Sequence, residues 1–325
     1  MHGIRIDKTL TRTVFHPLRR ALGRHALRLP VLMYHRICDD PEPSVSPYYK
    51  VNTSPVIFRR HLRQLADLGC RTMDLASLAA LLVRGEPLAP NSVAITFDDG
   101  FRDFYTQAFP VLQEHHFTAT VFLPTAFIGE QRRSFHGSEC LTWEEVRRLR
   151  HEGIEFGSHT VNHPKLVELS PPQVERELRE SKDQIEQHLA EKITTFAYPY
   201  AFPQTDAPFA RTLRDMLLQA GYTCCATTEI GRVKAGDDPF RLKRLPVNSL
   251  DDAPLFRAKL DGGYDWLASA QIMWKNLKAG IRPAARPHTP QTPPAVPSPL
   301  PSDGRGEGQG EVRVHGGTAH LTNRD

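Results

Sequence analysis

Two short segments of the chain place carboxylates and imidazoles in a pattern that suits metal-assisted hydrolysis. Asp98 and Asp99 directly follow the apolar run 93–97, although two adjacent aspartates before a glycine are, on their own, most often a solvated turn. His159 and His163 are four residues apart, and a helical turn with that spacing would point both imidazoles in the same direction. Joined to Asp99, the two histidines make a ligand set with open positions, as expected of a catalytic rather than a structural metal.

A hydrolase of this kind also needs groups that move protons. The attacking water must lose a proton, and the leaving group must gain one. His35 comes directly after the apolar run 31–34, and a lone histidine in such a place is most often structural. Asp98 and His35 are nevertheless available as the base and the acid, provided that the fold brings both to one rim.

The elements that must position these residues alternate between short apolar runs and longer segments of helical period. Helices are predicted to start at Ser54 before a proline, at Thr142 with Glu145 three residues on, and at Ser170, from which the helix runs to about residue 192. Seven runs are predicted strands: 31–34, 93–97, 118–123, 154–157, 195–198, 222–226 and 244–247. This alternation indicates one α/β domain of about 220 residues, a closed or nearly closed barrel of parallel strands with chemistry at their carboxyl ends.

Composition bounds the class of protein. The 325 residues include 41 lysines and arginines against 37 aspartates and glutamates, and 40% of them are hydrophobic. These proportions exclude fibrous, collagen-like and wholly disordered chains. The positive excess lies at the two ends, so residues 31–280 carry slightly more acidic than basic side chains. A nucleic-acid partner would need basic residues clustered on the folded part, and we expect none.

Residues 1–30 form a basic N-terminal arm with seven basic side chains against one acidic side chain. Phe15, Leu18, Leu22 and Ala26 recur in it at helical spacing. Such a helix either packs on the body with its arginines in water or makes peripheral contact with an anionic membrane surface. The apolar stripe is short, which favours packing.

The last part of the chain divides into closing helices and a tail. Residues 255–277 are predicted to be helices that pack on the barrel, and a sugar-stacking platform is the alternative interpretation of Trp266 and Trp274. Residues 281–325 hold eight of the 27 prolines, six of the 21 glycines and no aromatic residue. This composition predicts a disordered tail.

The cysteines and the apolar runs bear on the compartment. There are five cysteines without CxxC spacing, so reduced thiols are the simplest interpretation. No run approaches the roughly 18 apolar residues of a membrane span, and the first residues lack the apolar core of a signal peptide. We therefore expect the protein in the cytoplasm or at the cytoplasmic membrane surface.

Three motifs in order resemble those of the polysaccharide deacetylase family, the NodB homology domain of carbohydrate esterase family 4. They are TFDDG at 96–100, SHTVNH at 158–163 and FAYPY at 196–200. The segment LMYHRI at 32–37 precedes them, which resembles the circularly permuted branch typified by the poly-β-1,6-N-acetylglucosamine deacetylases. The resemblance covers roughly residues 30–250.

This resemblance implies a distorted (β/α)7 barrel that removes N-acetyl groups from an amino-sugar polysaccharide or glycan precursor with one divalent metal ion, most often Zn²⁺. By motif, the metal ligands would be Asp99, His159 and His163. Asp98 would take the proton of the attacking water, His35 would protonate the departing amine, and the backbone N–H of Tyr200 would stabilise the oxyanion.

Two positions depart from the family's pattern. Ala201 stands where the family often has glycine, and Ala197 stands where the non-permuted branch has an arginine that orients the catalytic aspartate. Arg241 and Arg244, near the last predicted strand, are candidates for that part, and a solvated basic patch is the other interpretation.

Two other functions fit parts of the pattern. A non-catalytic carbohydrate-binding relative would keep the barrel, but it would be expected to have lost at least one of the polar strand-end residues named above. A metal-dependent hydrolase of another bond, such as a phosphoester, would be expected to carry a glycine-rich or basic phosphate cradle beside the metal set. The sequence shows no such cradle there.

Overall fold

The computed structural model describes residues 5–22, 27–40, 45 and 50–281, with side chains placed as far as Met273. The predicted tail therefore lies outside the described residues, apart from its first residue, and so does the side chain of Trp274. In the described part of the chain, no helix combines the length and the hydropathy that crossing a bilayer requires.

Seven parallel strands close into a ring in the described part of the chain, which confirms the predicted (β/α)7 barrel. Each strand overlaps one of the seven predicted runs. The ring order is β2, β6, β7, β10, β11, β12 and β14, and β14 pairs with β2 again. Their bounds are β2 (Val31–Tyr34), β6 (Ser92–Phe97), β7 (Thr120–Leu123), β10 (Glu155–Ser158), β11 (Thr195–Ala197), β12 (Cys224–Ile230) and β14 (Leu242–Pro246).

The barrel is irregular at its edges. β5 (Arg71–Met73) pairs with the beginning of β6, and the register between β12 and β14 shifts between Ala226 and Ile230. Short strand pairs outside the ring join β1 (Arg28–Leu29) to β13 (Val233–Lys234), β3 (Arg36–Ile37) to β4 (Asn52–Thr53), and β8 (Ser134–Phe135) to β9 (Ser138–Glu139).

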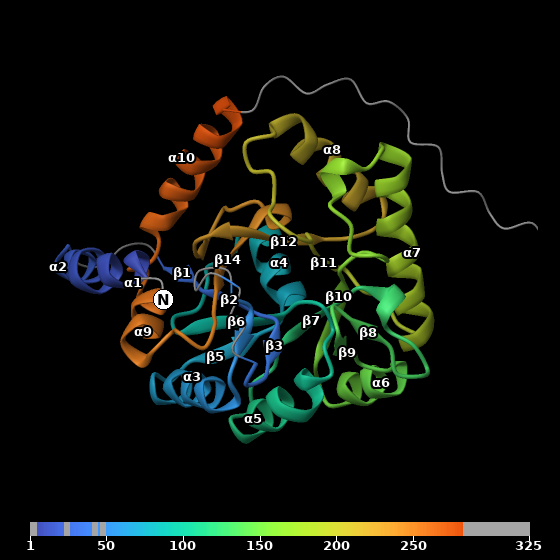
Figure 1. The fold of residues 1–325 in the computed structure, drawn as a ribbon, viewed down its shortest axis with the longest axis horizontal. Coiled ribbons are helices and arrows are strands. Elements are labelled where there is room, and N and C mark those ends of the chain that lie inside the picture. Colours follow the sequence, from blue (N-terminus) through green and yellow to red (C-terminus); the bar gives the residue numbers. More distant parts are fainter. Residues whose placement is uncertain (1–4, 23–26, 41–44, 46–49, 282–325) are drawn as a thin grey trace, which may run out of the picture. The chain divides into compact units, whose positions relative to one another are not determined.

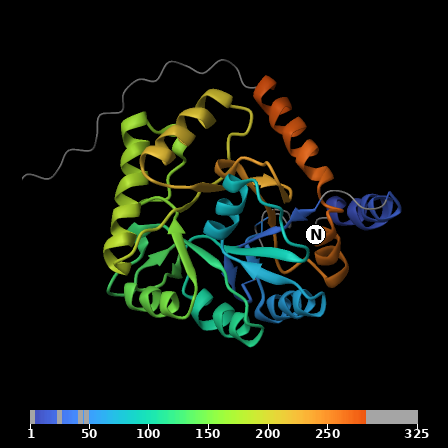
Figure 2. The same cartoon turned by 180° about the vertical axis from the view of Figure 1, so that it is seen from behind.

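Helices surround the strands (Figures 1 and 2). Around the ring lie α3 (Pro55–Asp67), α5 (Phe109–Glu114), α6 (Trp143–His151), α7 (Pro171–Leu189) and α8 (Ala207–Gln219). The predicted starts are confirmed: Ser54 caps α3, Thr142 and Glu145 form a capping box on α6, and Ser170 begins α7. The closing helices are α9 (Ala253–Asp261) and α10 (Trp266–Ile281).

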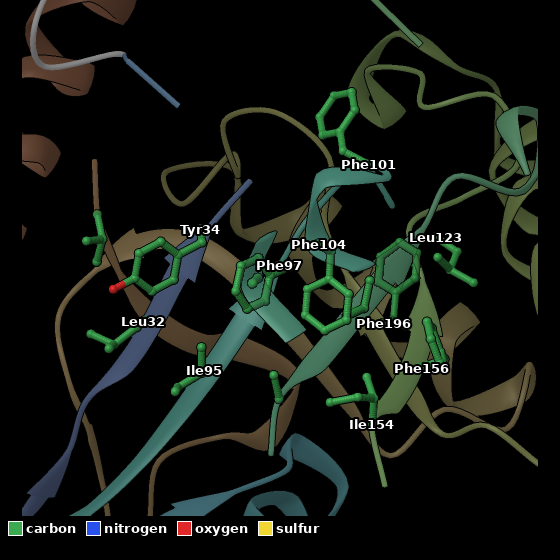
Figure 3. Close-up of a cluster of buried hydrophobic side chains, with 14 of the residues drawn as sticks. Leu32, Tyr34, Ile95, Phe97, Phe101, Phe104, Leu123, Ile154, Phe156 and Phe196 are labelled. Carbon is green, nitrogen blue, oxygen red and sulfur yellow. The ribbon is translucent and has the colours of Figure 1, made fainter. Parts of the chain in front are cut away.

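Side chains of the strands alternate between the outside and the inside of the ring, as the pleat requires. The outward residues pack against the helices in a large core that includes Phe97, Phe156 and Phe196 (Figure 3). The inward residues form a second cluster, in which Ala94 and Phe122 take part. The interior is crowded enough that a Cβ atom on Gly157 would lie 2.7 Å from the ring of Phe122, so only glycine fits there.

Helix α4 (Leu75–Arg84) closes the amino end of the barrel. Its Leu75, Leu78 and Ala79 are fully buried in the inward cluster, and the helix lies within the ring in both views (Figures 1 and 2). Glu155, at the start of β10, accepts hydrogen bonds from the N–H groups of Leu75 and Ala76 at 3.0 and 3.3 Å. The bottom of the barrel is thus a packed apolar plug.

The described part of the N-terminal arm packs on the closing helices. It contains α1 (Ile6–Leu10) and α2 (His16–Ala21), joined by a π-helical turn at Thr11–Phe15. Phe15 stacks on Trp266 with ring centroids 4.6 Å apart, and the Trp266 indole donates to the Thr11 hydroxyl. Leu18 and Leu22 of the predicted stripe are exposed, and Ala26 lies outside the described residues.

A buried histidine in the packing between α3 and α9 makes stability depend on pH. His61 stacks on Phe256 with centroids 4.1 Å apart, and its Nε2 lies 2.7 Å from the Asp251 carbonyl oxygen. Burial lowers the pKa of His61 to about 4, whereas an unfolded histidine has a pKa near 6.5. The unfolded state therefore binds more protons between these values, and stability present above pH 6.5 is lost as the pH falls towards 4.

We expect His61→Gln to flatten this dependence. Between pH 7 and pH 4 the variant should lose about 3 kcal/mol less of its free energy of unfolding than the wild type loses. Denaturant titrations at several pH values measure the difference. Equal slopes for the two proteins would contradict the assignment, whatever their stabilities at pH 7.

Candidate active site

The carboxyl ends of the strands surround a cavity of ≈ 460 Å³. It is lined by all six of the side chains predicted from the sequence: His35, Asp98, Asp99, His159, His163 and Tyr200. The strands bring them together because each follows directly on a strand or on the loop after it, and parallel strands end at the same rim.

Asp99 and the two histidines face one another. One ligand atom from each lies within 4.8 Å of the others. The Oδ1 atom of Asp99 is 3.6 Å from Nε2 of His159 and 3.3 Å from Nε2 of His163. The other nitrogen of His159, Nδ1, lies 2.8 Å from the carbonyl oxygen of Ala197. A carbonyl oxygen only accepts, so Nδ1 carries the hydrogen and the lone pair of Nε2 is directed at Asp99.

Several properties of this trio fit a divalent cation. Asp99 Oδ1 is buried and has no hydrogen-bond partner among the described residues. Burial lowers the pKa of His159, and burial together with His159 lowers that of His163 to about 2, so both imidazoles are neutral at pH 7. Burial, and then the charge of Asp98, raises the pKa of Asp99 well above its ordinary value. The Asp99 oxygen and the Nε2 lone pair of His159 therefore face each other without a positive partner between them. One carboxylate with two imidazoles is a ligand set that zinc accepts.

The segment between the two histidines is not a helical turn, so that part of the sequence prediction was wrong. Thr160 and His163 both have left-handed backbone angles, with φ of 70° and 53°. Glu177 on α7 accepts hydrogen bonds from the N–H groups of Val161 and Asn162 at 2.8 and 3.0 Å. The loop is thus held by hydrogen bonds to Glu177 and not by hydrogen bonds within a helical turn. The ring centroids of His159 and His163 nevertheless lie 4.8 Å apart.

Asp98 is paired with Arg244, which decides between the two arginines considered from the sequence. The guanidinium binds both carboxylate oxygens, at 2.6 and 2.8 Å, and its side chain is fully buried. Burial alone would raise the pKa of Asp98, but the charge and hydrogen bonds of Arg244, together with His159 and His35, hold it well below its usual range. Arg241 instead pairs with Glu229, outside the cavity.

His35 lies beside this pair. Its Nε2 is 3.8 Å from Oδ2 of Asp98. Burial lowers the pKa of His35 to about 4, although the charge of Asp98 opposes the shift. Asp251 and Asp252, the two acids after the last strand, are engaged elsewhere, with Lys259 and Lys8.

Tyr200 occupies a strained position at the cavity wall. Its φ is 58°, and its side chain is half-exposed, with the ring centroid 4.6 Å from that of His163. Its carbonyl oxygen accepts a hydrogen bond from the hydroxyl of Thr228 at 3.2 Å. Asp99 has φ of 72°, so the site contains several of the left-handed non-glycine residues of the described chain, and such strain concentrates at functional sites.

Comparison with known families agrees with this geometry. Residues 85–225, which contain Asp98, Asp99, His159 and His163, match a family model described as polysaccharide deacetylase. The matched segment, from β6 to the start of β12, is a polysaccharide deacetylase domain. Such a domain indicates an enzyme that hydrolyses carbon–nitrogen bonds other than peptide bonds.

Individual relatives of the deacetylase cover different parts of it. YxkH of Bacillus subtilis, named as a candidate polysaccharide deacetylase, is 28% identical over 68% of this chain and 72% of its own. The poly-β-1,6-N-acetyl-D-glucosamine N-deacetylase of Staphylococcus aureus is 29% identical over 35% of this chain and 42% of its own. The structure of the Streptococcus pyogenes deacetylase PplD shares the fold, with a TM-score of 0.62 and 24% identity over 73% of this chain and 99% of that one.

Part of the wall of the deacetylase cavity is formed by elements other than the ends of the barrel strands, so the strand pattern of the sequence did not predict it. Phe135 and His136, in the β8–β9 hairpin, and Gln271, on α10, line the wall. Gln271 donates to the carbonyl oxygen of Thr228 and accepts from the N–H of Ile230, both at 3.1 Å. Its position as a polar residue between apolar neighbours of a predicted closing helix is a weak signal that could have pointed to it.

Proposed function

We propose that this deacetylase removes acetyl groups from the amino groups of N-acetylated sugar residues in a glycan. The reaction would use a divalent metal ion, most simply Zn²⁺, held by Asp99, His159 and His163. The observation that carries the proposal is that one cavity is lined by this trio, by His35 and by Asp98, which Arg244 holds from behind. When bound, the cation would polarise the acetyl carbonyl and make the attacking water more acidic.

Asp98 is the proposed general base. Arg244 keeps its carboxylate ionised and fixes both oxygens, so the group that takes the proton is always in its basic form at neutral pH. A carboxylate of such low pKa is a weak base, and it therefore suits only a water that has already been made acidic.

His35 is the proposed acid that protonates the amine. Its low pKa means that it is neutral before the reaction and must gain a proton during it. Asp98 is the adjacent source, because 3.8 Å separates the two groups. The proton lost by the water would then pass through Asp98 and His35 to the departing nitrogen, which leaves both residues as they began.

Tyr200 is the proposed oxyanion donor through its backbone N–H. The hydrogen bond from Thr228 to its carbonyl holds the next peptide unit and so restrains the backbone at Tyr200, and none of the described residues accepts a hydrogen bond from its N–H. A preorganised donor of this kind typically contributes a few kcal/mol to stabilisation of a transition state.

The name of the Staphylococcus aureus relative supplies a first substrate to test, β-1,6-linked oligomers of N-acetylglucosamine. Acetate release from these oligomers should fall to background after chelation and return on addition of Zn²⁺. Release that persists under chelation would contradict the metal dependence. Binding of the oligomer without any release of acetate would favour a non-catalytic carbohydrate-binding protein. The proposed location, the cytoplasm or the cytoplasmic membrane surface, is tested by cell fractionation.

A further inference from the structure

A second cavity, of ≈ 520 Å³, lies at the amino ends of β2 and β6, where Pro30 and Ser92 form part of its wall. Five arginines line it: Arg19 and Arg20 of α2, Arg28 of β1, Arg232, which follows β12, and Arg257 of α9. We call it the arginine pocket. The catalytic cavity lies at the opposite, carboxyl ends of the same strands.

Acidic side chains compensate only part of this charge. Asp265 serves three of the arginines, with Oδ2 at 3.0 Å from Arg232, 3.8 Å from Arg19 and 4.0 Å from Arg28. Asp261 pairs with Arg257 at 2.9 Å. Arg20 has neither a hydrogen bond nor an ion pair with any described residue. Five guanidinium groups against two carboxylates leave an excess of three positive charges around one cavity.

The backbone is shaped to hold these cations together. Gly262 has φ of 87°, and a Cβ atom there would overlap the guanidinium of Arg232 and lie 2.8 Å from Nε of Arg19. The Arg232 side chain is only 7% exposed. Burial and the neighbouring charge of Arg232 lower the pKa of Arg19. Like charges kept this close and partly out of water are costly unless an anion joins them.

We propose that the arginine pocket binds a phosphoryl group with two or more negative charges. Planar guanidinium groups bind phosphate oxygens in pairs, which is why arginine predominates in such sites. The group could belong to a soluble phosphate or to a phospholipid headgroup. Leu27, at the pocket wall, and Leu18 and Leu22, on the adjacent arm, are all more than half exposed, and they could contact acyl chains beside a headgroup.

The test compares the full chain with the double variant Arg20→Gln/Arg28→Gln, whose two side chains are the least engaged in structural contacts. Inorganic pyrophosphate, measured by calorimetry at fixed ionic strength, probes the soluble source. Sedimentation with phosphatidylcholine vesicles, with and without phosphatidic acid, probes the headgroup. Arg211→Gln/Arg179→Gln removes the same charge from exposed positions on α8 and α7 and serves as the control.

The double variant should bind at least one of the two probes about tenfold or more weakly than the wild type, because it lacks two guanidinium groups that would donate to the anion. The control variant should bind like the wild type. Binding of pyrophosphate identifies the soluble source, and binding confined to acidic vesicles identifies the headgroup. Absence of binding to both probes, or equal binding by the double variant and the wild type, would overturn the proposal. Acetate release should be the same in all three proteins, so this outcome is independent of the deacetylase proposal.

Discussion

Arg244→Met is expected to lower the free energy of unfolding by about 3–5 kcal/mol, because it leaves the buried carboxylate of Asp98 without its counter-charge. The same change should lower kcat for acetate release about a hundredfold or more, since the base loses the partner that orients it and keeps it ionised. KM should change little, because Arg244 lies behind Asp98 and is fully buried. Denaturant titration and steady-state kinetics measure the two effects.

A double-mutant cycle separates the charge from the packing. Asp98→Asn/Arg244→Met removes both members of the pair, so it should regain most of the stability that the single variant loses, while activity stays at background. Arg244→Lys should rescue only part of the activity, because an ammonium group cannot bind both oxygens in the plane of the carboxylate. A double variant as unstable as Arg244→Met would show that lost packing, and not an unpaired charge, is the cause.

Asp99→Asn is expected to act in opposite directions on stability and on activity. In the metal-free protein the buried carboxyl group faces the Nε2 lone pair of His159 and the charge of Asp98, whereas an amide can donate a hydrogen bond to that lone pair. The variant should therefore be about 1–3 kcal/mol more stable than the metal-free wild type. Acetate release should fall at least about a thousandfold, because the anionic ligand is lost.

The matched control is Asp103→Asn, at a half-buried aspartate close in sequence. Asp103 accepts hydrogen bonds from the N–H of Ile37 at 3.0 Å and from Arg36 at 3.4 Å, one on each oxygen, so the NH₂ group of an asparagine would face a donor there and stability should fall. Thermal unfolding of both variants in chelator, with bound Zn²⁺ determined on reconstituted samples, measures the contrast. If Asp99→Asn lowers stability as Asp103→Asn does, Asp99 is a structural residue and not a ligand held ready for a cation.

The strands of the barrel could be predicted from the sequence because each is an apolar run. Since active sites of such barrels lie at the carboxyl ends of the strands, His35, Asp98 and Asp99 could then be predicted to lie at one rim. The choice between Arg241 and Arg244 could not be made in the same way. Residues on a strand alternate inward and outward, and Arg244 shares the inward side with Leu242 because both belong to β14. The predicted strand began at residue 244, which left out Leu242 and with it the sign of which side Arg244 faces.

The loop that carries the two histidines shows a different limit. Spacing alone predicted a helical turn, but Glu177 of α7 binds two of the loop's N–H groups, and nothing in the local sequence reveals that contact. Gln271 was missed for a related reason, because its place at the cavity wall goes with bonds from α10 to the distant end of β12. Strand ends could be predicted locally, whereas contacts that depend on packing between distant segments could not.

The helix α4 has a consequence for the traffic of molecules through the barrel. Its buried leucines fill the amino end, so the described residues leave no exit from the catalytic cavity through that end. Acetate would then leave on the side by which the sugar chain enters, and a bound glycan would slow its departure. Turnover on long chains would then depend on how the polymer slides across the mouth, and acetate would be expected to accumulate as a competing occupant.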